Sequence, residues 1–470
     1  MMANKMREMV CQQRDFFKGR ATLPYEKRLR WLRKLKAGLA LHEGAIHAAL
    51  KKDLGRPVFE SYITETGFVQ HDLTHTIKNL KKWMRTKRVK TPLLSQPASS
   101  RIQFSPLGVT LIIAPFNYPF ALAVLPMIAA IAAGNTVVLK ASELAPATSA
   151  LLERIIGELF EPCHVAIVSG AIEETTLLLQ QRFDHIFFTG STRVGSIVMK
   201  AAAEHLTPVT LELGGKSPCI VHHDARLDIA VSRICYGKFL NAGQTCVAPD
   251  YILVHGDVKE PFLERLRQRI TDLYGKGEQA AESDSYSRMI NEHHHDRVVG
   301  LIDPTKVIIG GQHDRANRFI APTVMDQVTL TDAVMTEEIF GPVLPVLEYN
   351  DFKDIYETID QLPHHPLACY LFSESRKVQE ELTSTIQFGG GCINHCVQHL
   401  VNPHLPFGGV GQSGMGSYHG FHGFKRFSHK KGILKASSRP WSDAPLVYPP
   451  YSKKLFGLLD KFTLLRRLLK

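Results

Sequence analysis

The chain has 470 residues, of which 44% are hydrophobic and 21% are charged. This length suits two or three folded cores, and the composition excludes a disordered, collagenous or coiled-coil protein. The formal net charge is +11, but neither a zinc-finger spacing nor an aromatic RNA-binding signature accompanies it, so we expect no nucleic-acid partner. Eight cysteines are too sparse for a disulfide scaffold. Because no secretory signal is visible at the amino terminus, we expect reduced thiols in a cytoplasmic protein.

The first 82 residues predict helices, because polar and apolar residues recur there at helical spacing. Residues 84–103 carry basic residues followed by prolines, and we expect them to leave the main domain. Residues 102–139 contain no Asp, Glu, Lys or Arg and exceed the roughly 20 residues of a membrane span. Prolines interrupt this apolar stretch, which therefore predicts a βαβ unit with a strand at 109–113, a helix at 120–132 and a strand at 136–139.

Strands and helices continue to alternate beyond this unit. We expect further strands at 165–168 and 185–188, and helices at 145–160, 173–181 and 190–203. This alternation is typical of a doubly wound parallel sheet. After Gly214-Gly215 the pattern restarts and predicts a second α/β domain, with strands at 219–221 and 251–254 and helices at 228–240 and 261–273.

A glycine-bearing turn, Gly190–Gly195, follows a predicted strand and opens a predicted helix. It departs from the dinucleotide fingerprint because Thr192 stands at the second glycine position, so that by itself it fits an ordinary βα turn better. Lys140 and Glu143 end an earlier strand of the same sheet, where they could exchange hydrogen bonds with ribose hydroxyls. By themselves, these two residues also fit a solvated loop.

Cys246 differs from most of the other cysteines, which lie in apolar runs and are expected to be inert core thiols. It ends the polar loop Asn241–Thr245. A loop thiol near backbone N–H groups can ionise and act as a covalent catalyst.

Glu212 is a candidate general base, because it lies between Leu211 and Leu213 in an apolar segment. Poor solvation raises the pKa of a carboxyl group, which can then accept a proton near neutral pH. A buried salt bridge explains this residue equally well from the segment alone.

Two stretches mimic the spacing of metal ligands, one with Cys392, His395, Cys396 and His399 and the other at 293–295. A zinc site needs four converging ligands with supporting hydrogen bonds. Neither stretch offers a paired C-x-x-C knuckle, and the chain has 22 histidines. We therefore expect no metal site.

Five motifs occur in the order found in aldehyde dehydrogenases: APFNYP at 114–119, FTGS at 188–191, LELGGK at 211–216, GQTC at 243–246 and EEIFGP at 337–342. The chain resembles class 3 of this family, which includes fatty aldehyde dehydrogenases. It is short at its amino terminus, and residues 406–420 (PFGGVGQSGMGSYHG) are similar to the C-terminal signature of that class. The resemblance covers residues 5–435.

The resemblance implies a Rossmann-like doubly wound cofactor domain, a second α/β catalytic domain and a small bridging or oligomerisation element. We expect the NAD(P)-binding domain at 1–83 and 105–213, the catalytic domain at 214–410, the bridging element at 84–104 and 411–435, and a basic amphipathic tail at 436–470. A homodimer is also implied.

The same resemblance implies the roles of the candidate residues. Cys246 would be the nucleophile, Glu212 the general base for the deacylating water, and Asn117 an oxyanion-hole donor beside the backbone N–H of Cys246. NAD or NADP would be held by Lys140, Glu143, Gly190, Ser191, Gly195, Glu338 and Phe340.

The implied activity is the oxidation of medium- or long-chain aliphatic or aromatic aldehydes to carboxylic acids, through a cysteine thiohemiacetal and thioester. One alternative is a CoA-acylating enzyme of the family, against which Glu212 counts because thiol transfer needs no base for water. The other is a binding or structural protein that has lost turnover. The sequence leaves the individual aldehyde and the choice between NAD and NADP open.

The carboxyl terminus carries a separate signal, because residues 453–470 combine apolar residues at helical spacing with six Lys or Arg residues and one Asp. This segment is too short and too charged to span a bilayer, but it can lie in the membrane interface. We expect peripheral membrane contact there, which suits a lipophilic substrate. The alternative is that the segment packs on the body or on the dimer partner.

Overall fold

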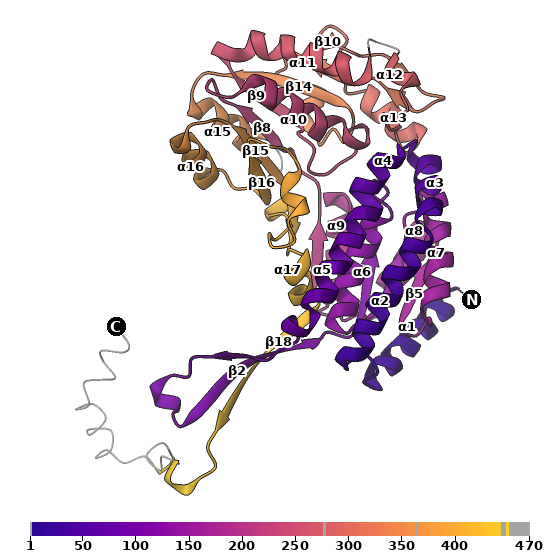
Figure 1. Ribbon diagram of the computed structural model, residues 1–470, viewed down its shortest axis with the longest axis vertical. Helices are drawn as coiled ribbons and strands as arrows, with labels where there is room; N and C mark the ends of the chain where they lie inside the picture. The colour runs from indigo at the N-terminus through magenta and orange to yellow at the C-terminus, as the bar shows by residue number, and fades with distance from the viewer. Residues whose placement is uncertain (1, 276–278, 363–364, 443–447, 451–470) are drawn as a thin grey trace, which may run out of the picture. The chain divides into compact units, whose positions relative to one another are not determined.

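The computed structural model describes residues 2–275, 279–362, 365–442 and 448–450 (Figure 1). The chain divides into a larger unit, residues 1–83 and 105–429, and a smaller unit, residues 84–104 and 430 onward. The tail predicted at 453–470 lies outside the described residues. Within the described part, no helix has both the length and the apolar character needed to cross a membrane.

The amino-terminal part of the larger unit is helical, as predicted. Its elements are α1 (Met2–Lys18), α2 (Tyr25–Leu41), α3 (Glu43–Leu54), α4 (Val58–Ser61), the π-helix η1 (Tyr62–Thr66) and α5 (Gly67–Trp83). Helix α2 buries Leu32, Leu35 and Leu39, whose spacing places them on one helical face. The side chain of Gln13 ties α1 to the neighbouring sheet, since its Nε2 donates a hydrogen bond to the carbonyl oxygen of Val137 at 2.8 Å.

The first sheet has six strands in the order β17-β7-β6-β3-β4-β5. Its strands are β3 (Val109–Ile113), β4 (Thr136–Lys140), β5 (Val165–Val168), β6 (His185–Thr189), β7 (Val209–Glu212) and β17 (Gly414–Met415). All pairs are parallel except β17 with β7. The chain runs from β3 outward to β4 and β5 and then returns to β6 on the other side of β3, which confirms the predicted doubly wound sheet.

Helices α6 (Ala121–Ala133), α7 (Pro146–Leu159), α8 (Ile172–Leu179) and α9 (Thr192–Ala203) connect these strands. The predicted strands agree with the observed ones to within one residue, and the predicted helices to within two. One core cluster joins residues of α1, α8 and α9 to the sheet, including Met6, Leu178 and Val198. Burial on both faces explains why the strands are continuously apolar.

The second sheet has seven strands in the order β10-β13-β14-β9-β8-β15-β16, and only β10 is antiparallel to its neighbour. Its strands are β8 (Pro218–Val221), β9 (Tyr251–His255), β10 (Val307–Ile309), β13 (Thr323–Met325), β14 (Val343–Tyr349), β15 (Ala368–Phe372) and β16 (Gly390–Ile393). The helices that flank it in the chain are α10 (Leu227–Phe239), α11 (Lys259–Tyr274), α15 (Phe352–Gln361) and α16 (Arg376–Thr385). The predicted restart of the α/β pattern is therefore confirmed.

Shorter elements complete the larger unit. They are the 3-10 helices η3 (Leu240–Gly243), η4 (Gly256–Val258), η5 (Gln398–Val401) and η6 (Gly411–Ser413), the helices α12 (Gln279–Glu282), α13 (Glu292–Val299), α14 (Ala333–Thr336) and α17 (Gly420–Arg426), and the paired strands β11 (His313–Asp314) and β12 (Phe319–Ile320).

The smaller unit is built on a three-stranded sheet in the order β1-β2-β18. The strands are β1 (Lys87–Val89), β2 (Ala98–Pro106) and β18 (Ser428–Ala436), and the short 3-10 helices η2 (Leu93–Ser95) and η7 (Pro440–Ser442) accompany them. Residues 411–429, which were expected in the bridging element, lie in the larger unit. The division expected at residues 213 and 214 falls between β7 of the first sheet and β8 of the second.

Candidate active site

Most candidate residues of the first sheet lie at its carboxyl edge. Asn117 follows β3, Lys140 ends β4, Gly190 follows β6 and Glu212 ends β7. The chain leaves β3 in one direction and returns through β6 on its other side. Open α/β sheets bind ligands at the carboxyl ends of the strands where the strand order reverses in this way.

The loop that carries Cys246 has an unusual backbone. Asn241 and Ala242 have φ angles of 53° and 50°, in the left-handed region that residues other than glycine seldom adopt. Gly243 follows with a φ of 74°, and a Cβ atom there would lie 2.2 Å from the carbonyl oxygen of Gly341. Only glycine fits this position. The loop of Cys246 therefore packs closely against the EEIFGP motif at 337–342.

Asn117 lies beside this loop. Its side chain is buried, and its Nδ2 donates a hydrogen bond to the carbonyl oxygen of Gln244 at 3.1 Å. An amide nitrogen carries two hydrogens, so one N–H remains for another acceptor. The structure therefore brings the predicted oxyanion donor to a residue only two positions from Cys246.

A buried arginine connects Asn117 with the same loop. Arg56 is fully buried and donates hydrogen bonds to the backbone carbonyl oxygen of Asn117 and, at 2.7 Å, to Oδ1 of Asn241. Asn241 in turn donates from Nδ2 to the carbonyl oxygens of Asn117 at 2.9 Å and Gln244 at 3.1 Å. An ion pair with the equally buried Glu65 compensates the charge of Arg56. We call Arg56, Asn117 and Asn241 the loop brace.

Glu212 is buried, with 3% of its surface exposed, and neither carboxyl oxygen has a hydrogen-bond partner among the described residues. Burial raises the pKa of Glu212 well above its usual value, and the charge of Arg426 offsets part of the increase. The sequence also allowed Glu212 to form a buried salt bridge. In the described part of the chain, no cation lies within ion-pair distance of Glu212.

Cys246 as a residue is partly exposed, whereas Cys219 and Cys235 are buried. Burial of the thiol raises the pKa of Cys246, and the carboxylates of Glu338 and Glu212 raise it further. The backbone N–H groups of Cys246 and Val247 act in the opposite direction. The thiol is therefore protonated at neutral pH in this arrangement, and a proton acceptor or an added positive charge is needed to form the thiolate.

Glu338 shares this environment. Burial and the neighbouring Asp250 raise the pKa of Glu338 to about 8, although the backbone N–H of Gly215 and the charges of Lys216 and Arg297 act against them. A Cβ atom at Gly214 would lie 1.9 Å from Oε2 of Glu338, so a larger residue here would displace this carboxyl group. The ring of Phe340 packs edge-on against Phe116, at 5.7 Å between ring centroids.

Cys246 opens onto a cavity of about 110 Å³. Among the residues that the structure describes, no Asp, Glu, Lys or Arg lines it. Its lining residues are Ile63, Thr64, Phe68, Tyr118, Ala121, Leu122, Leu125, Tyr236, Leu240, Thr245, Cys246, Val247, Val397, Gln398, Leu400, Val401, Phe407, Tyr418 and His419. Burial lowers the pKa of His419 to about 3, so this histidine is neutral as well. The wall therefore suits an uncharged, apolar molecule.

Residues 1–433 match the aldehyde dehydrogenase family. The chain belongs to this family.

Individual relatives match over nearly their whole length. The 4,4'-diaponeurosporen-aldehyde dehydrogenase of Staphylococcus aureus is 44% identical over 453 residues, which cover 96% of this chain and 98% of that protein. The dimeric NADP-preferring aldehyde dehydrogenase of Rattus norvegicus is 43% identical over 448 residues, which cover 95% and 98%. A solved structure of Staphylococcus aureus AldH in its substrate-bound state superimposes with a TM-score of 0.93 at 43% identity and covers 97% of this chain and 98% of that one.

These matches confirm several predictions. Family 3 members are 44% and 42% identical to this chain, which confirms the resemblance to class 3. The two sheets of the larger unit form the aldehyde dehydrogenase fold. The protein is an oxidoreductase that converts aldehydes to carboxylic acids with NAD or NADP.

The carboxyl edge of the first sheet of this aldehyde dehydrogenase fits a dinucleotide. A Cβ atom at Gly195 would lie 2.7 Å from the side chain of Leu213, so glycine allows α9 to pack closely on the sheet. Ser191 caps α9 through its hydroxyl, which accepts a hydrogen bond from the N–H of Val194 at 3.4 Å. Nζ of Lys140 lies 3.2 Å from Glu143. Helix N-termini bind phosphate groups, and the Lys140–Glu143 pair supplies donors and acceptors for hydroxyls.

Arg56 and the bracing role of Asn241 were not predicted from the sequence. Asn241 stands within the nucleophile-loop motif, so its polar side chain was a usable signal. Arg56 is separated from Asn241 by 185 positions, and its neighbours Gly55 and Pro57 carry no functional pattern.

The stretch that carries Cys392, His395, Cys396 and His399 makes local contacts. Sγ of Cys392 lies 3.4 Å from Nδ1 of His399, and burial lowers the pKa of His399 to about 4. Nδ1 of His395 lies 2.7 Å from the carbonyl oxygen of Cys396. Within the described residues, no group of three or more His, Cys, Asp or Glu side chains converges as metal ligands do.

Proposed function

We propose that Cys246 is the nucleophile of this aldehyde dehydrogenase, Asn117 an oxyanion donor and Glu212 the base that activates water. The observation that carries the proposal is the hydrogen bond from Asn117 into the loop of Cys246. It lies at the sheet edge where Glu212 has two carboxyl oxygens without a hydrogen-bond partner among the described residues.

In the first half-reaction, the thiol of Cys246 gives its proton to water, and Sγ of the resulting thiolate adds to the carbonyl carbon of the aldehyde and forms a thiohemiacetal. Negative charge develops on the former carbonyl oxygen. The free N–H of Asn117 and the backbone N–H of Cys246 are the donors for this oxygen. One such donor typically contributes about 2.7–4 kcal/mol to transition-state stabilisation. Because the loop brace fixes the donor before the substrate arrives, little reorganisation is needed during the reaction.

The cofactor residues would hold NAD or NADP, which when bound would accept the hydride that the thiohemiacetal carbon loses as the thioester forms. Lys140 and Glu143 would bind the adenosine ribose. The turn at 190–195, with Ser191 at the start of α9, would bind the pyrophosphate through backbone N–H groups. Glu338 and Phe340 would hold the nicotinamide ribose.

In the second half-reaction, water attacks the thioester on Cys246 after Glu212 removes its proton. This role requires ionised Glu212. Its raised pKa makes the carboxylate a stronger proton acceptor than an exposed one. The absence of hydrogen-bond partners for either oxygen among the described residues leaves both available to water.

The substrates are apolar aldehydes. Support comes from the cavity at Cys246, whose lining carries no Asp, Glu, Lys or Arg among the described residues. A charged aldehyde would lose its hydration there without gaining an oppositely charged partner. Medium-chain and long-chain aliphatic aldehydes and aromatic aldehydes lose no such hydration.

Substitution of the nucleophile tests the proposal. Cys246→Ala should abolish NADH formation from aldehydes, while NAD binding, measured by calorimetry, stays within a factor of two because its proposed contacts lie elsewhere. Cys235→Ala is the matched control, since Cys235 is a buried thiol of α10 outside the cavity lining. Turnover by Cys246→Ala above a few per cent of wild type would contradict covalent catalysis.

We also propose a homodimer that is cytoplasmic and touches membranes peripherally through residues 453–470. The name of the Rattus norvegicus relative supports the dimer. In the smaller unit, the outer strands β1 and β18 each have one free edge within the described sheet, and such edges can pair with a second copy. The membrane contact rests on the sequence pattern of the tail. Light scattering tests the dimer, and sedimentation with anionic vesicles, with and without residues 452–470, tests the tail.

A further inference from the structure

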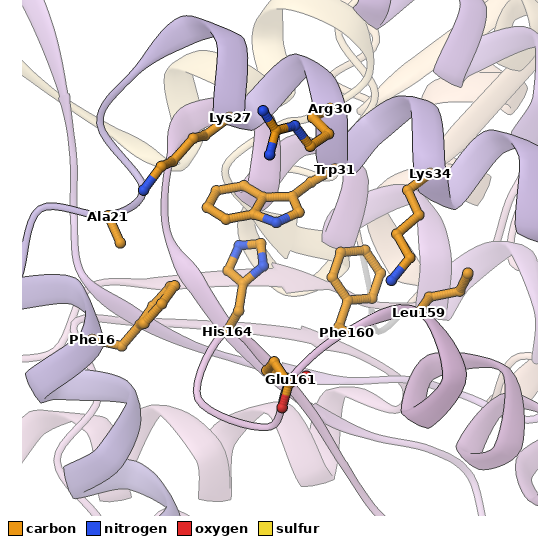
Figure 2. A pocket seen from close by; sticks show the side chains of 10 residues that line it. All are labelled: Phe16, Ala21, Lys27, Arg30, Trp31, Lys34, Leu159, Phe160, Glu161 and His164. Carbon is orange, nitrogen blue, oxygen red and sulfur yellow. The ribbon is translucent and has the colours of Figure 1, made fainter.

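A second cavity, of about 380 Å³, lies in the larger unit outside the catalytic machinery (Figure 2). It is bordered by α1, α2 and the connection between α7 and β5, and its lining residues are Phe16, Ala21, Lys27, Arg30, Trp31, Lys34, Leu159, Phe160, Glu161 and His164. The carbonyl oxygen of His164 accepts a hydrogen bond from the N–H of Val137 near the start of β4, whereas Lys140 ends that strand. The cavity therefore lies at the amino edge of the sheet, opposite the cofactor residues.

Aromatic rings form much of its wall. The ring of Trp31 lies 3.9 Å from that of His164 between centroids, and Phe16 and Phe160 contact the same imidazole at 5.8 and 5.5 Å. Figure 2 shows His164 beneath Trp31, with Phe16 on one side and Phe160 on the other. Phe16 and Trp31 are only half-buried. A flat ring can stack on their accessible faces.

Among the described residues that line this cavity, His164 is the one whose buried polar atoms lack a hydrogen-bond partner. Only 3% of its surface is exposed, yet neither ring nitrogen has a hydrogen-bond partner in the described part of the chain. Burial lowers the pKa of His164 to about 3, so the imidazole is neutral at physiological pH and offers one donor and one acceptor. Buried polar groups without partners are uncommon in folded proteins, and a bound molecule is one way to satisfy them.

The rim is cationic. Lys27, Arg30 and Lys34 follow one another at spacings of three and four residues, which places them on the same face of α2, and all three are exposed. Glu161 is the single acidic residue that the described part of the chain contributes to the lining. The rim therefore favours an anion by two positive charges.

We propose that this cavity binds an aromatic monocarboxylate. The aromatic ring of the ligand packs against Trp31 and Phe16. Its carboxylate lies among Lys27, Arg30 and Lys34, and one carboxylate oxygen accepts a hydrogen bond from the neutral imidazole of His164. The ligand bridges α1, α2 and the start of β5, so its binding stabilises the folded protein.

Isothermal titration calorimetry of the full chain with 2-naphthoate as the probe tests this site. We expect wild type to bind at micromolar to low millimolar concentration and to be thermally stabilised. The uncharged analogue 2-naphthalenemethanol should bind at least tenfold more weakly. A Lys27→Gln/Arg30→Gln/Lys34→Gln variant, whose altered side chains are exposed, should lose at least tenfold in affinity. His164→Phe keeps a flat ring but removes the donor, so it should also weaken binding.

A carboxylate of this kind also resembles a reaction product and can enter the catalytic cavity, where binding is seen as inhibition of aldehyde oxidation. The triple variant should keep wild-type kcat/KM and wild-type inhibition by 2-naphthoate while its calorimetric affinity falls. Equal binding by wild type, the triple variant and His164→Phe would overturn the proposal, because all binding would then be catalytic-site binding. Equal affinity for acid and alcohol, or no binding by wild type at millimolar probe, would overturn it as well.

Discussion

The guanidinium of Arg56 donates to the side-chain oxygen of Asn241 at 2.7 Å and to the backbone carbonyl oxygen of Asn117. These two acceptors belong to the proposed oxyanion donor and to the loop of the proposed nucleophile. A single buried cation thus connects the two groups that we propose to act on one carbonyl.

Arg56→Lys should lower kcat by roughly ten- to a hundredfold, because lysine cannot reproduce the forked donor geometry and a hydrogen bond to a charged group contributes about 1.5–3 kcal/mol. The affinity for NAD, measured by calorimetry, should stay within a factor of two. Arg28→Lys is the matched control. Arg28 is also buried and donates to the carbonyl oxygens of Thr22 and Ala132. We expect the control to lower stability and leave kcat unchanged, and an unchanged kcat in Arg56→Lys would contradict the brace.

Glu212→Gln should separate the two half-reactions. Hydride transfer needs no base for water, so rapid mixing should show a burst of NADH close to one equivalent per active site, followed by turnover at least a hundredfold slower than in wild type. A lost burst would assign Glu212 to the activation of Cys246 instead. Unchanged steady turnover would show that another carboxylate is the base. Glu338→Gln then tests whether Glu338 is that carboxylate.

The raised pKa of Glu338 predicts a pH dependence of stability. The carboxyl group has a pKa of about 8 in the folded protein against an ordinary value of 4.5. Between these values the unfolded chain releases the proton while the folded protein keeps it. The stabilisation is therefore complete below pH 4.5 and is lost as the pH rises towards 8, at no more than about 1.4 kcal/mol per pH unit. Urea denaturation of wild type and Glu338→Gln at pH 5, 6, 7 and 8 measures this, and wild type should lose stability faster. Parallel curves would show that the shift is absent.

Val401→Glu should raise KM for long-chain apolar aldehydes at least tenfold and affect short-chain aldehydes less. Val401 lines the cavity at Cys246 and is 50% exposed, so the charge lies at the mouth and does not threaten folding. Leu405→Glu is the control, since Leu405 is 44% exposed and does not line the cavity. A panel of aldehydes of graded length provides the measurement. The same rise in KM for every chain length would contradict an apolar channel.

The sheets were predictable because their strands are apolar on both faces and the intervening segments have helical length. Val109–Ile113 and Val165–Val168 are observed with the predicted bounds for that reason. Glu212 could also be identified as poorly solvated from Leu211 and Leu213. These signals are local, and each one depends on a few neighbouring residues.

The loop brace was not predictable in the same way. Arg56 meets Asn241 across 185 positions, and only the folded chain shows that its charge is paired with Glu65. The division of residues 411–435 between the two units was not predictable either. Gly414 pairs with Glu212 as part of the first sheet, whereas β18 joins the smaller unit, and no composition change marks the boundary between them.

The π-helix η1 places two functions on one turn of the chain. Ile63 and Thr64 line the cavity at Cys246, and Glu65 holds Arg56. The segment that lines the proposed substrate cavity is therefore also the segment that anchors Arg56 and, through it, the loop of Cys246. Changes in substrate preference and in turnover number should therefore be coupled at this segment. The effects on kcat of a substitution that widens the wall at Ile63 and of a substitution of Arg56 should not be additive, and a double-mutant cycle measures their coupling.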